Sequence, residues 1–284
     1  MESHPNVNRF DRLEIKVLLD ARQRRAIESA VRARMMPDPY GDAEGCYPIV
    51  SLYLDDAELS AYWDRDRRIA SRRKLRVRVY GGASTRAAPA CFVEIKHKYG
   101  GRTAKRRIAL PVAEALAVVA GEAPSTPLTF LDALVVREAQ TMVRDDGLTP
   151  CCVMRYDRHA YLGDAEAPDL RITFDSAVRT RARDLALAPD DDDFDASLLP
   201  DGASTLEIKV DLVVPWWLAK AVGDLGPVGA AVSKYALAAE RLLVPPYLAS
   251  LRPAAKAAPT HNRNGRMVHG HVQPVLRRTP QSGR

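Results

Sequence analysis

The sequence contains few cysteines and no hydrophobic run long enough to cross a membrane. Its four cysteines among 284 residues form neither a disulfide framework nor a paired CxxC metal site, which indicates a reducing compartment. The longest apolar stretches, such as residues 115–120 and 212–219, fall far below the ~18 residues that a membrane span requires. Residues 1–10 also lack the apolar core of a signal peptide. We therefore expect a soluble, cytoplasmic protein.

Acidic residues are absent from the C-terminal end of the sequence. Residues 252–284 hold seven Lys or Arg and no Asp or Glu, whereas the other residues carry 35 basic against 36 acidic side chains. The net charge of +6 therefore reflects a tail and not a basic binding face, so we expect no nucleic-acid partner. The tail has almost no apolar periodicity, which predicts a folded domain over residues 1–251 and a disordered basic tail over residues 252–284.

Alternation of apolar and charged residues predicts strands through much of the domain. In the first strand, residues 11–19, every second residue from Leu13 onward is apolar. Further strands are predicted at residues 49–54, 74–80, 92–98, 102–107, 153–161, 170–175 and 206–212. Helices are predicted at residues 21–35, 56–63, 112–120, 128–143, 216–222 and 233–243. Asp20 and Gln23 form a capping-box pattern at the first helix, and Pro245-Pro246 is expected to end the last one.

A Glu-Ile-Lys triplet recurs on three of these strands. It occurs as Glu14-Ile15-Lys16, Glu94-Ile95-Lys96 and Glu207-Ile208-Lys209, and each copy places an acid and a base on one strand face. One such face alone is typical of a strand with a solvated side. Here the helices between the strands must cover the apolar faces, so we expect the charged faces to point inward.

Inward charges on neighbouring strands restrict what the interior can hold. Side chains that face each other across two strands are about 5 Å apart. Like charges at that separation repel by about 3 kcal/mol at an effective dielectric constant of about 20. Such an interior is tolerable with interspersed acids and with a polyanion or a metal inside. Arg and Lys match phosphate oxygens, and carboxylates suit a hard divalent cation that bridges those oxygens.

Eight short stretches of the sequence occur in the order of a known family. They are Arg12-Leu-Glu-Ile-Lys16, Ser51-Leu-Tyr-Leu-Asp55, Lys74-Leu-Arg-Val-Arg78, Phe92-Val-Glu-Ile-Lys96, Arg155-Tyr-Asp-Arg158, Leu170-Arg-Ile-Thr-Phe-Asp175, Leu206-Glu-Ile-Lys209 and Ser233-Lys-Tyr235. Over residues 9–245 the chain thereby resembles the polyphosphate polymerase domain of the vacuolar transporter chaperone (VTC) type, within the triphosphate tunnel metalloenzymes. The resemblance implies an α+β, CYTH-like fold, in which an antiparallel β-barrel flanked by helices forms a tunnel for a triphosphate chain.

The resemblance also implies roles for individual residues. The residues that would bind phosphate are Lys16, Arg76, Arg78, Lys96, Arg158, Arg171, Ser233 and Lys234. Among them Lys234, Arg76 and Arg78 would act catalytically, with Ser233 and Lys234 near the reacting end. Glu207 would bind a divalent metal, Mn²⁺ or Mg²⁺. Lys105 is a further candidate, but the continuous basic run at residues 105–107 leaves its register open.

The implied activity is an ATP-dependent phosphotransferase that adds the γ-phosphoryl group of ATP to a growing polyphosphate chain. A tunnel-fold hydrolase of triphosphate or polyphosphate and a non-catalytic polyphosphate- or inositol-phosphate-binding module remain as alternatives. Arg12 occupies the place where the hydrolytic and cyclase branches typically have a glutamate, which favours transfer. The presence of both Glu207 and Lys234 argues against a non-catalytic module. The implied partners are ATP and inorganic polyphosphate, and a membrane-protein partner that exports the product stays open.

Overall fold

A computed structural model describes residues 13–81, 90–100, 102–188, 190–211, 213–229 and 233–251. The chain divides into two units, Met1–Tyr247 and Leu248–Arg284. Arg12 and the predicted tail over residues 252–284 lie outside the described residues.

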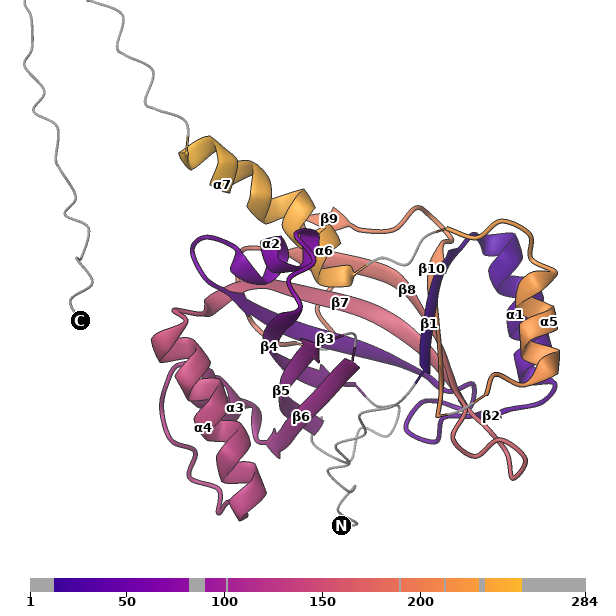
Figure 1. Ribbon diagram of the computed structural model, residues 1–284, viewed down its shortest axis with the longest axis horizontal. Helices are drawn as coiled ribbons and strands as arrows, with labels where there is room; N and C mark the ends of the chain where they lie inside the picture. Colours follow the sequence, from indigo (N-terminus) through magenta and orange to yellow (C-terminus); the bar gives the residue numbers. More distant parts are fainter. Residues whose placement is uncertain are drawn as a thin grey trace, which may run out of the picture. The chain divides into compact units, whose positions relative to one another are not determined.

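One antiparallel sheet organises the first unit (Figure 1). Its strands are β1 (Leu13–Leu19), β3 (Cys46–Asp55), β4 (Ser71–Tyr80), β5 (Ala90–Tyr99), β6 (Arg102–Leu110), β7 (Thr149–Leu162), β8 (Arg171–Arg181) and β10 (Ser204–Val210). They follow the order β1-β10-β8-β7-β3-β4-β5-β6, while the short strands β2 (Met36–Pro37) and β9 (Ala196–Ser197) pair with β7 and β8. All eight predicted strands are present, and the predicted α+β, antiparallel fold is confirmed.

The sheet curls so that strands distant in the sheet order approach each other. Lys96 on β5 lies 3.9 Å from Glu14 on β1, although five strands separate β1 and β5 in the sheet. Within the described residues no ladder joins the edge strands β1 and β6. The predicted barrel is therefore a curled half-barrel, in which side chains rather than backbone hydrogen bonds connect the two ends.

Helices cover the outer face of the curled sheet (Figure 1). On one side α1 (Ala21–Arg32) and α5 (Trp216–Gly223) pack over apolar side chains of β1, β8 and β10, such as Ile172 and Ile208. On the other side α3 (Val112–Val119) and α4 (Phe130–Asp145) cover β4, β5 and β6, where Leu75 and Ile95 are fully buried. Within the described residues no helix is both long and apolar enough to cross a membrane.

The charged side chains that alternate with these apolar residues occupy the opposite side of the sheet, which we call the inner face. One end of the inner face is covered by α2 (Ser60–Asp66) and α6 (Lys234–Ala238), which pack against β3 and β7. The rings of Tyr235 on α6 and Tyr53 on β3 stack with their centroids 5.2 Å apart. The hydroxyl of Tyr235 also donates a hydrogen bond to the buried carboxylate of Asp55. These contacts fix the start of α6 against the inner face.

The first helix begins as predicted, whereas the last predicted helix does not end where expected. The amide of Gln23 donates to Asp20 Oδ1 at 2.8 Å, and the side chain of Gln23 accepts from the amide of Asp20 at 3.1 Å. Pro245-Pro246 was expected to end the last helix, but α6 continues through a π-helical turn, η1 (Ala239–Leu243), into α7 (Val244–Ser250). Both prolines lie in the first turn of α7, directly after the π-helical turn.

An arginine occupies a left-handed position at the end of α2. Arg68 has φ of 58°, and its amide donates to the carbonyl of Arg65 at 3.2 Å. The next amide, of Ile69, donates to the carbonyl of Asp64 at 2.9 Å. These two bonds form a Schellman motif, whose left-handed residue is usually glycine. A side chain in this conformation costs roughly 1–2 kcal/mol, and Leu59, Ala177 and Asp184 also have a positive φ.

Candidate functional site

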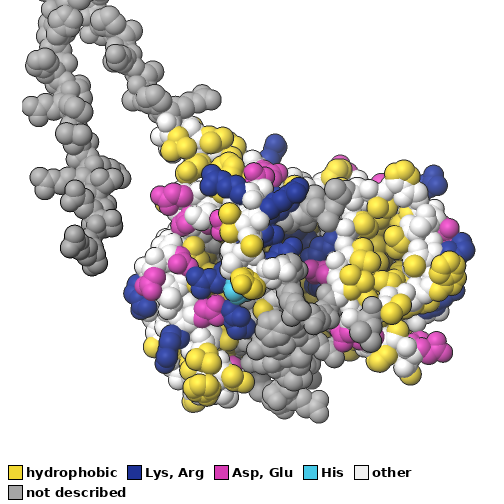
Figure 2. Space-filling model, viewed as in Figure 1, with side chains coloured by type: hydrophobic (Ala, Val, Ile, Leu, Met, Phe, Trp, Pro, Cys, Tyr) yellow, Lys and Arg dark blue, Asp and Glu magenta, His cyan; other side chains and the backbone are white. Residues whose placement is uncertain are grey.

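The inner face carries charged side chains from seven strands, β1, β4, β5, β6, β7, β8 and β10. The ladders pair Lys16 with Glu207, Arg76 with Glu94, and Lys96 with Lys105, which places all six side chains on the same side of the sheet. Figure 2 shows dark-blue Lys and Arg side chains gathered near the middle of the view, between the two helix-covered sides. The expectation that the charged faces point inward is therefore confirmed for all three Glu-Ile-Lys triplets.

Glu94 is the centre of a first group of charges, the Glu94 cluster. Its carboxylate is 1% exposed and accepts from Arg76 Nε at 2.8 Å and from Arg76 Nη2 at 2.6 Å. Lys105 forms a further ion pair with Glu94, and the guanidinium groups of Arg78 and Arg107 lie 3.9 Å from it. Burial alone would raise the pKa of Glu94, but Arg76, Lys105 and Arg78 hold it well below its usual value.

The register left open for Lys105 is resolved by this cluster. Lys105 and Arg107 point to the inner face, whereas Arg106 points outward and forms a bidentate pair with Glu138 on α4, at 2.8 and 2.6 Å. Lys105 therefore belongs with the predicted phosphate-binding residues in space.

Glu207 and Asp175 form the centre of a second group, the Glu207 cluster. The carboxylate of Glu207 lies 3.0 Å from both Lys16 Nζ and Lys209 Nζ, and 3.9 Å from Lys234 Nζ. Burial opposes ionisation of Glu207, yet Lys209, Lys234 and Lys16 hold its pKa well below the usual value. All three lysines therefore contact one buried carboxylate.

Asp175 is the second buried carboxylate of the Glu207 cluster. The side chain of Arg158 donates to both oxygens of Asp175, at 2.7 and 2.8 Å, and Lys234 Nζ lies 2.5 Å away. Burial would raise the pKa of Asp175, but Arg158 and Lys234 lower it to about 2. Lys234 thus connects α6 to the sheet through a fully buried carboxylate.

Tyr156 and Glu14 connect the two clusters. The Tyr156 ring has Arg78 at 5.9 Å, Arg158 at 5.5 Å and Lys234 at 4.9 Å from its centroid, which is within cation–π range. Glu14 lies 3.1 Å from Lys16 and 3.9 Å from Lys96. Burial lowers the pKa of Lys96 to about 8, even though Glu14 partly opposes this effect. One connected network therefore brings together Lys16, Arg76, Arg78, Lys96, Arg158, Glu207 and Lys234.

Two predicted residues have different surroundings from the rest. Arg171 shares the inner face, but its Nη2 donates to Asp38 at 2.8 Å and to the hydroxyl of Tyr47 at 3.0 Å. The hydroxyl of Ser233 accepts from the amide of Ala236 at 3.4 Å, so it caps α6. Arg171 therefore lies apart from the two clusters, and Ser233 supports the helix that carries Lys234.

Several residues of the network were not among the predicted site residues. Lys74, Lys209 and Arg107 continue the same strand alternation as predicted neighbours, so the period of two could have indicated them. Tyr80 follows Arg76 and Arg78 in the same alternation, although a phenol by itself did not indicate a role in the network. Burial and Glu94 would raise the pKa of this phenol, but Arg78 and Lys105 lower it to about 7. The cations of the inner face thus favour ionisation even of a tyrosine.

The described residues offer no preformed metal cage. Within them no three His, Cys, Asp or Glu side chains gather closely enough to hold a metal ion. Both oxygens of Glu207 already contact lysines, at 3.0 Å each. A magnesium-like ion commonly binds through one or two carboxylates together with substrate phosphates. The donor set of Glu207 therefore fits a divalent cation that arrives with phosphate oxygens, and not one held by the protein alone.

Comparisons with known proteins give the following relationships. The model of the VTC domain family matches residues 11–243. A candidate adenylate cyclase from Bacillus halodurans is 12% identical, with 82% of this chain and 97% of that chain covered at a TM-score of 0.45. A Hippeastrum protein, described as a candidate adenylyl cyclase with a dominant triphosphatase activity, is 16% identical, with 84% and 98% covered at a TM-score of 0.46. No curated protein sequence matches the chain.

Proposed function

Because this chain belongs to the VTC domain family, we propose that it is a metal-dependent polyphosphate polymerase that transfers the γ-phosphoryl group of ATP to a growing polyphosphate chain. The family lies within the triphosphate tunnel superfamily of phosphate-handling enzymes. The finer assignment to polymer synthesis is the part that we propose. It is supported by the charges of the inner face.

The observation that carries the proposal is an excess of cations over carboxylates. The cations of the two clusters and of Lys96 are Lys16, Arg76, Arg78, Lys96, Lys105, Arg107, Arg158, Lys209 and Lys234. Within the described residues these nine cations contact four carboxylates of the inner face, Glu14, Glu94, Asp175 and Glu207. A linear polyanion can supply the missing negative charge along the whole face.

Binding then proceeds by exchange of partners. The guanidinium groups of Arg76 and Arg158 each donate two hydrogen bonds to a carboxylate, and each can instead donate both to two phosphate oxygens. The lysines can likewise exchange a carboxylate for a phosphate oxygen, each through a single ammonium group. When Lys16 and Lys209 turn to phosphate, the oxygens of Glu207 become available for Mg²⁺ or Mn²⁺. Glu207 would hold this ion, which would supply positive charge against the phosphate groups.

The chain's own residues contribute alignment and charge stabilisation. In the transfer a terminal oxygen of the polyphosphate bonds to the γ-phosphorus of ATP, the bond from that phosphorus to the β–γ bridging oxygen breaks, and ADP leaves. This reaction requires little covalent chemistry from a protein. Lys234, Arg158 and Arg78 converge on the Tyr156 ring, so all three can act on the same phosphoryl group.

Product analysis with labelled ATP tests the proposal. The purified protein is incubated with γ-labelled ATP and Mn²⁺ or Mg²⁺, and the products are resolved on a denaturing gel. We expect a ladder of labelled polymer that disappears in Lys234→Ala and persists in Lys220→Ala, a matched change at an exposed lysine that pairs with Asp224. Release of labelled phosphate without polymer would instead identify a hydrolase, and binding without turnover would identify a phosphate-binding module.

A further inference from the structure

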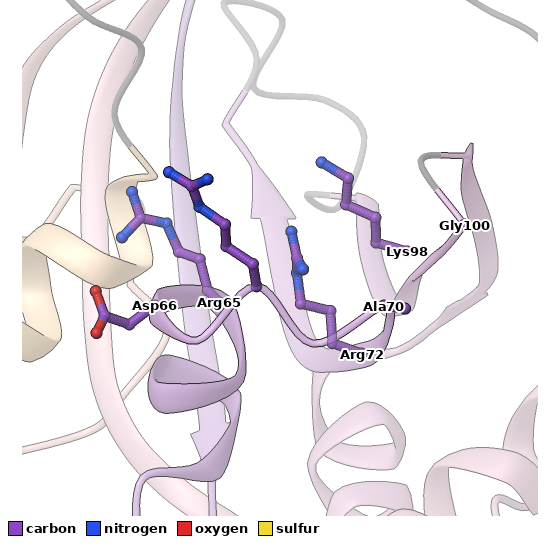
Figure 3. A pocket seen from close by; sticks show the side chains of 7 residues that line it. Arg65, Asp66, Ala70, Arg72, Lys98 and Gly100 are labelled. Atoms are coloured by element: carbon purple, nitrogen blue, oxygen red, sulfur yellow. The ribbon is translucent and has the colours of Figure 1, made fainter.

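A second concentration of positive charge lies at the end of α2, outside the two clusters. A pocket of about 570 Å³ is lined there by Arg65, Asp66, Arg68, Ala70, Arg72, Lys98 and Gly100. We call it the α2–β4 pocket. Figure 3 shows the side chains of Arg65, Arg72 and Lys98 reaching to the same side, with the carboxylate of Asp66 on the side away from Lys98. Four cations and one acid thus surround an open space.

The cations of this pocket are poorly neutralised. Arg65 lies 4.0 Å from Glu240, and Arg72 donates to the carbonyl of Ile69 at 2.7 Å. In the part of the chain that the structure describes, no ion pair involves Arg68, Arg72 or Lys98. A group of unpaired cations around an open space attracts anions, and several such cations favour a ligand with several negative charges.

The pocket continues the inner face along the same strands. Arg72 on β4 pairs with Lys98 on β5, and two residues further along the same strands Lys74 pairs with Lys96. A step of two residues in a strand is about 7 Å, so both rows belong to one charged surface. The Arg72–Lys98 pair and the Lys74–Lys96 pair also interact electrostatically. Burial lowers the pKa of Lys74 to about 8, and Arg65, Lys96 and Arg72 contribute to that lowering against the opposite effect of Asp55.

The backbone of Arg68 explains how the end of α2 places a cation at this pocket. Its φ of 58° lies in the left-handed region, at the Schellman position that glycine normally occupies. Glycine at that position would relieve the strain, yet the chain carries a long cationic side chain there. Leu59, Ala177 and Asp184 share a left-handed φ, so what sets Arg68 apart is its place in the lining of the pocket.

We propose that the α2–β4 pocket binds the phosphate units of a linear polyphosphate that extend beyond those held by the inner face. The proposal rests on the proposed function, because it assigns the acceptor or product chain of that reaction to this end of the inner face. A triphosphate is then held by the two clusters alone, whereas a longer chain also contacts Arg68, Arg72 and Lys98. The pocket therefore makes affinity depend on chain length.

Direct binding measurements test this dependence without requiring turnover. The affinities of inorganic tripolyphosphate and of polyphosphate with tens of units are measured for the full chain, for Arg72→Gln/Lys98→Gln and for Arg25→Gln. The last is a matched change at an exposed arginine on α1. We expect the double variant to bind the long chain at least about fivefold more weakly and tripolyphosphate equally well, with no change for Arg25→Gln.

The outcomes separate this inference from the proposed function. An unchanged long-chain affinity in the double variant, or an equal loss for both ligands, would overturn the separate subsite. If the wild-type chain forms no polymer from ATP but shows the expected length dependence, the proposed function fails while the subsite stands. If polymer forms and the length dependence is absent, the subsite fails while the proposed function stands.

Arg68→Gly gives a second, sharper test, because its effects on folding and on binding have opposite signs. Removal of the left-handed strain should raise the melting temperature by about 2 °C or more. Loss of the cation should weaken long-chain binding severalfold and leave tripolyphosphate binding unchanged. A lower melting temperature together with equal weakening for both ligands would instead show that Arg68 serves only the fold.

Discussion

The inner face and the α2–β4 pocket hold similar cations, but they neutralise them in different ways. On the inner face each cluster surrounds a buried carboxylate, such as Glu94 at 1% or Asp175 at 0% exposure. In the pocket Arg68 and Lys98 have no ion-pair partner among the described residues, and the side chains border open space. Desolvated cations need counter-ions within the fold, whereas solvated ones do not.

This difference predicts two kinds of anion binding. A phosphate chain on the inner face must displace carboxylates from arginine and lysine, so binding is an exchange and the fold depends on the displaced acids. In the pocket an anion meets Arg68, Arg72 and Lys98, which form no ion pair within the described residues, so binding is an addition and the fold does not depend on it. The following predictions test this contrast, from the largest expected effect to the smallest.

Glu207→Gln should have the largest effect, because it leaves Lys16, Lys209 and Lys234 without their shared counter-ion. We expect a loss of about 3–5 kcal/mol in the free energy of unfolding, measured by urea unfolding, together with loss of turnover. Saturating tripolyphosphate should restore part of that stability, because it binds only the folded state and replaces the missing charge. Glu166→Gln, on an exposed loop, is the control. Equal stability of Glu207→Gln and wild type would contradict the exchange model.

Asp175→Asn should remove an acid-sensitive part of the stability. The pKa of Asp175 is lowered to about 2, below its usual value, so its contribution is fully present above about pH 4 and is lost as pH falls through about 2. That contribution amounts to about 2 kcal/mol. Unfolding curves collected between pH 5 and pH 2 should therefore fall more steeply for wild type than for Asp175→Asn. Parallel curves would show that Arg158 and Lys234 do not stabilise this carboxylate.

Anion binding at pH 8 should take up protons. Lys74 and Lys96 have pKa values of about 8, lowered mainly by burial, so each is about half protonated at that pH. A bound polyanion raises both pKa values and also that of Tyr80, which is about 7 and leaves this phenol mostly ionised at pH 8, so the uptake should lie between about one and two protons in total. Calorimetry in two buffers with different ionisation enthalpies measures it. We expect the buffer dependence to vanish at pH 6, where both lysines are already charged, and its absence at pH 8 would refute the prediction.

Lys98→Gln should have the smallest effect on folding. Since no buried carboxylate depends on Lys98, its removal should change the free energy of unfolding by no more than about 0.5 kcal/mol. The matched change on the inner face, Arg158→Gln, leaves Asp175 buried beside one remaining cation and should cost several times more. Similar losses in the two variants would remove the distinction between exchange and addition.

The sequence was sufficient to predict the strands and the direction of their charged faces, because a period of two is a local property. It indicated that Glu14-Ile15-Lys16 and Glu207-Ile208-Lys209 each carry an acid and a base. It could not indicate that Lys16 faces Glu207, because this contact depends on the register between β1 and β10, two strands that are neighbours in the sheet but far apart in the sequence. The counter-ion of Arg171 was equally hidden, since Asp38 belongs to no alternating pattern.

Tertiary context also explains the two features that sequence reasoning handled least well. In the basic run Lys105-Arg106-Arg107 every residue is charged, so the sequence alone does not show which side chains face inward. The ion pairs with Glu94 on one side of the sheet and with Glu138 on the other show the direction of Lys105 and Arg106. Pro245-Pro246 was expected to end a helix, and the rule failed because a π-helical turn precedes the prolines and places them in the first turn of α7. The residue roles implied by the family resemblance stay predictions that the variants above test.

The pairing of β1 with β10 has a consequence for the timing of synthesis. The first strand of the described chain pairs with a strand that is made about 190 residues later. At about 5–20 residues per second, a ribosome needs about 10–40 s to reach that point. Glu14 and Lys16 cannot join Glu207 and Lys209 before then, so a nascent chain has no complete inner face. The polyanion binding that we propose for the inner face would therefore become possible only late in translation.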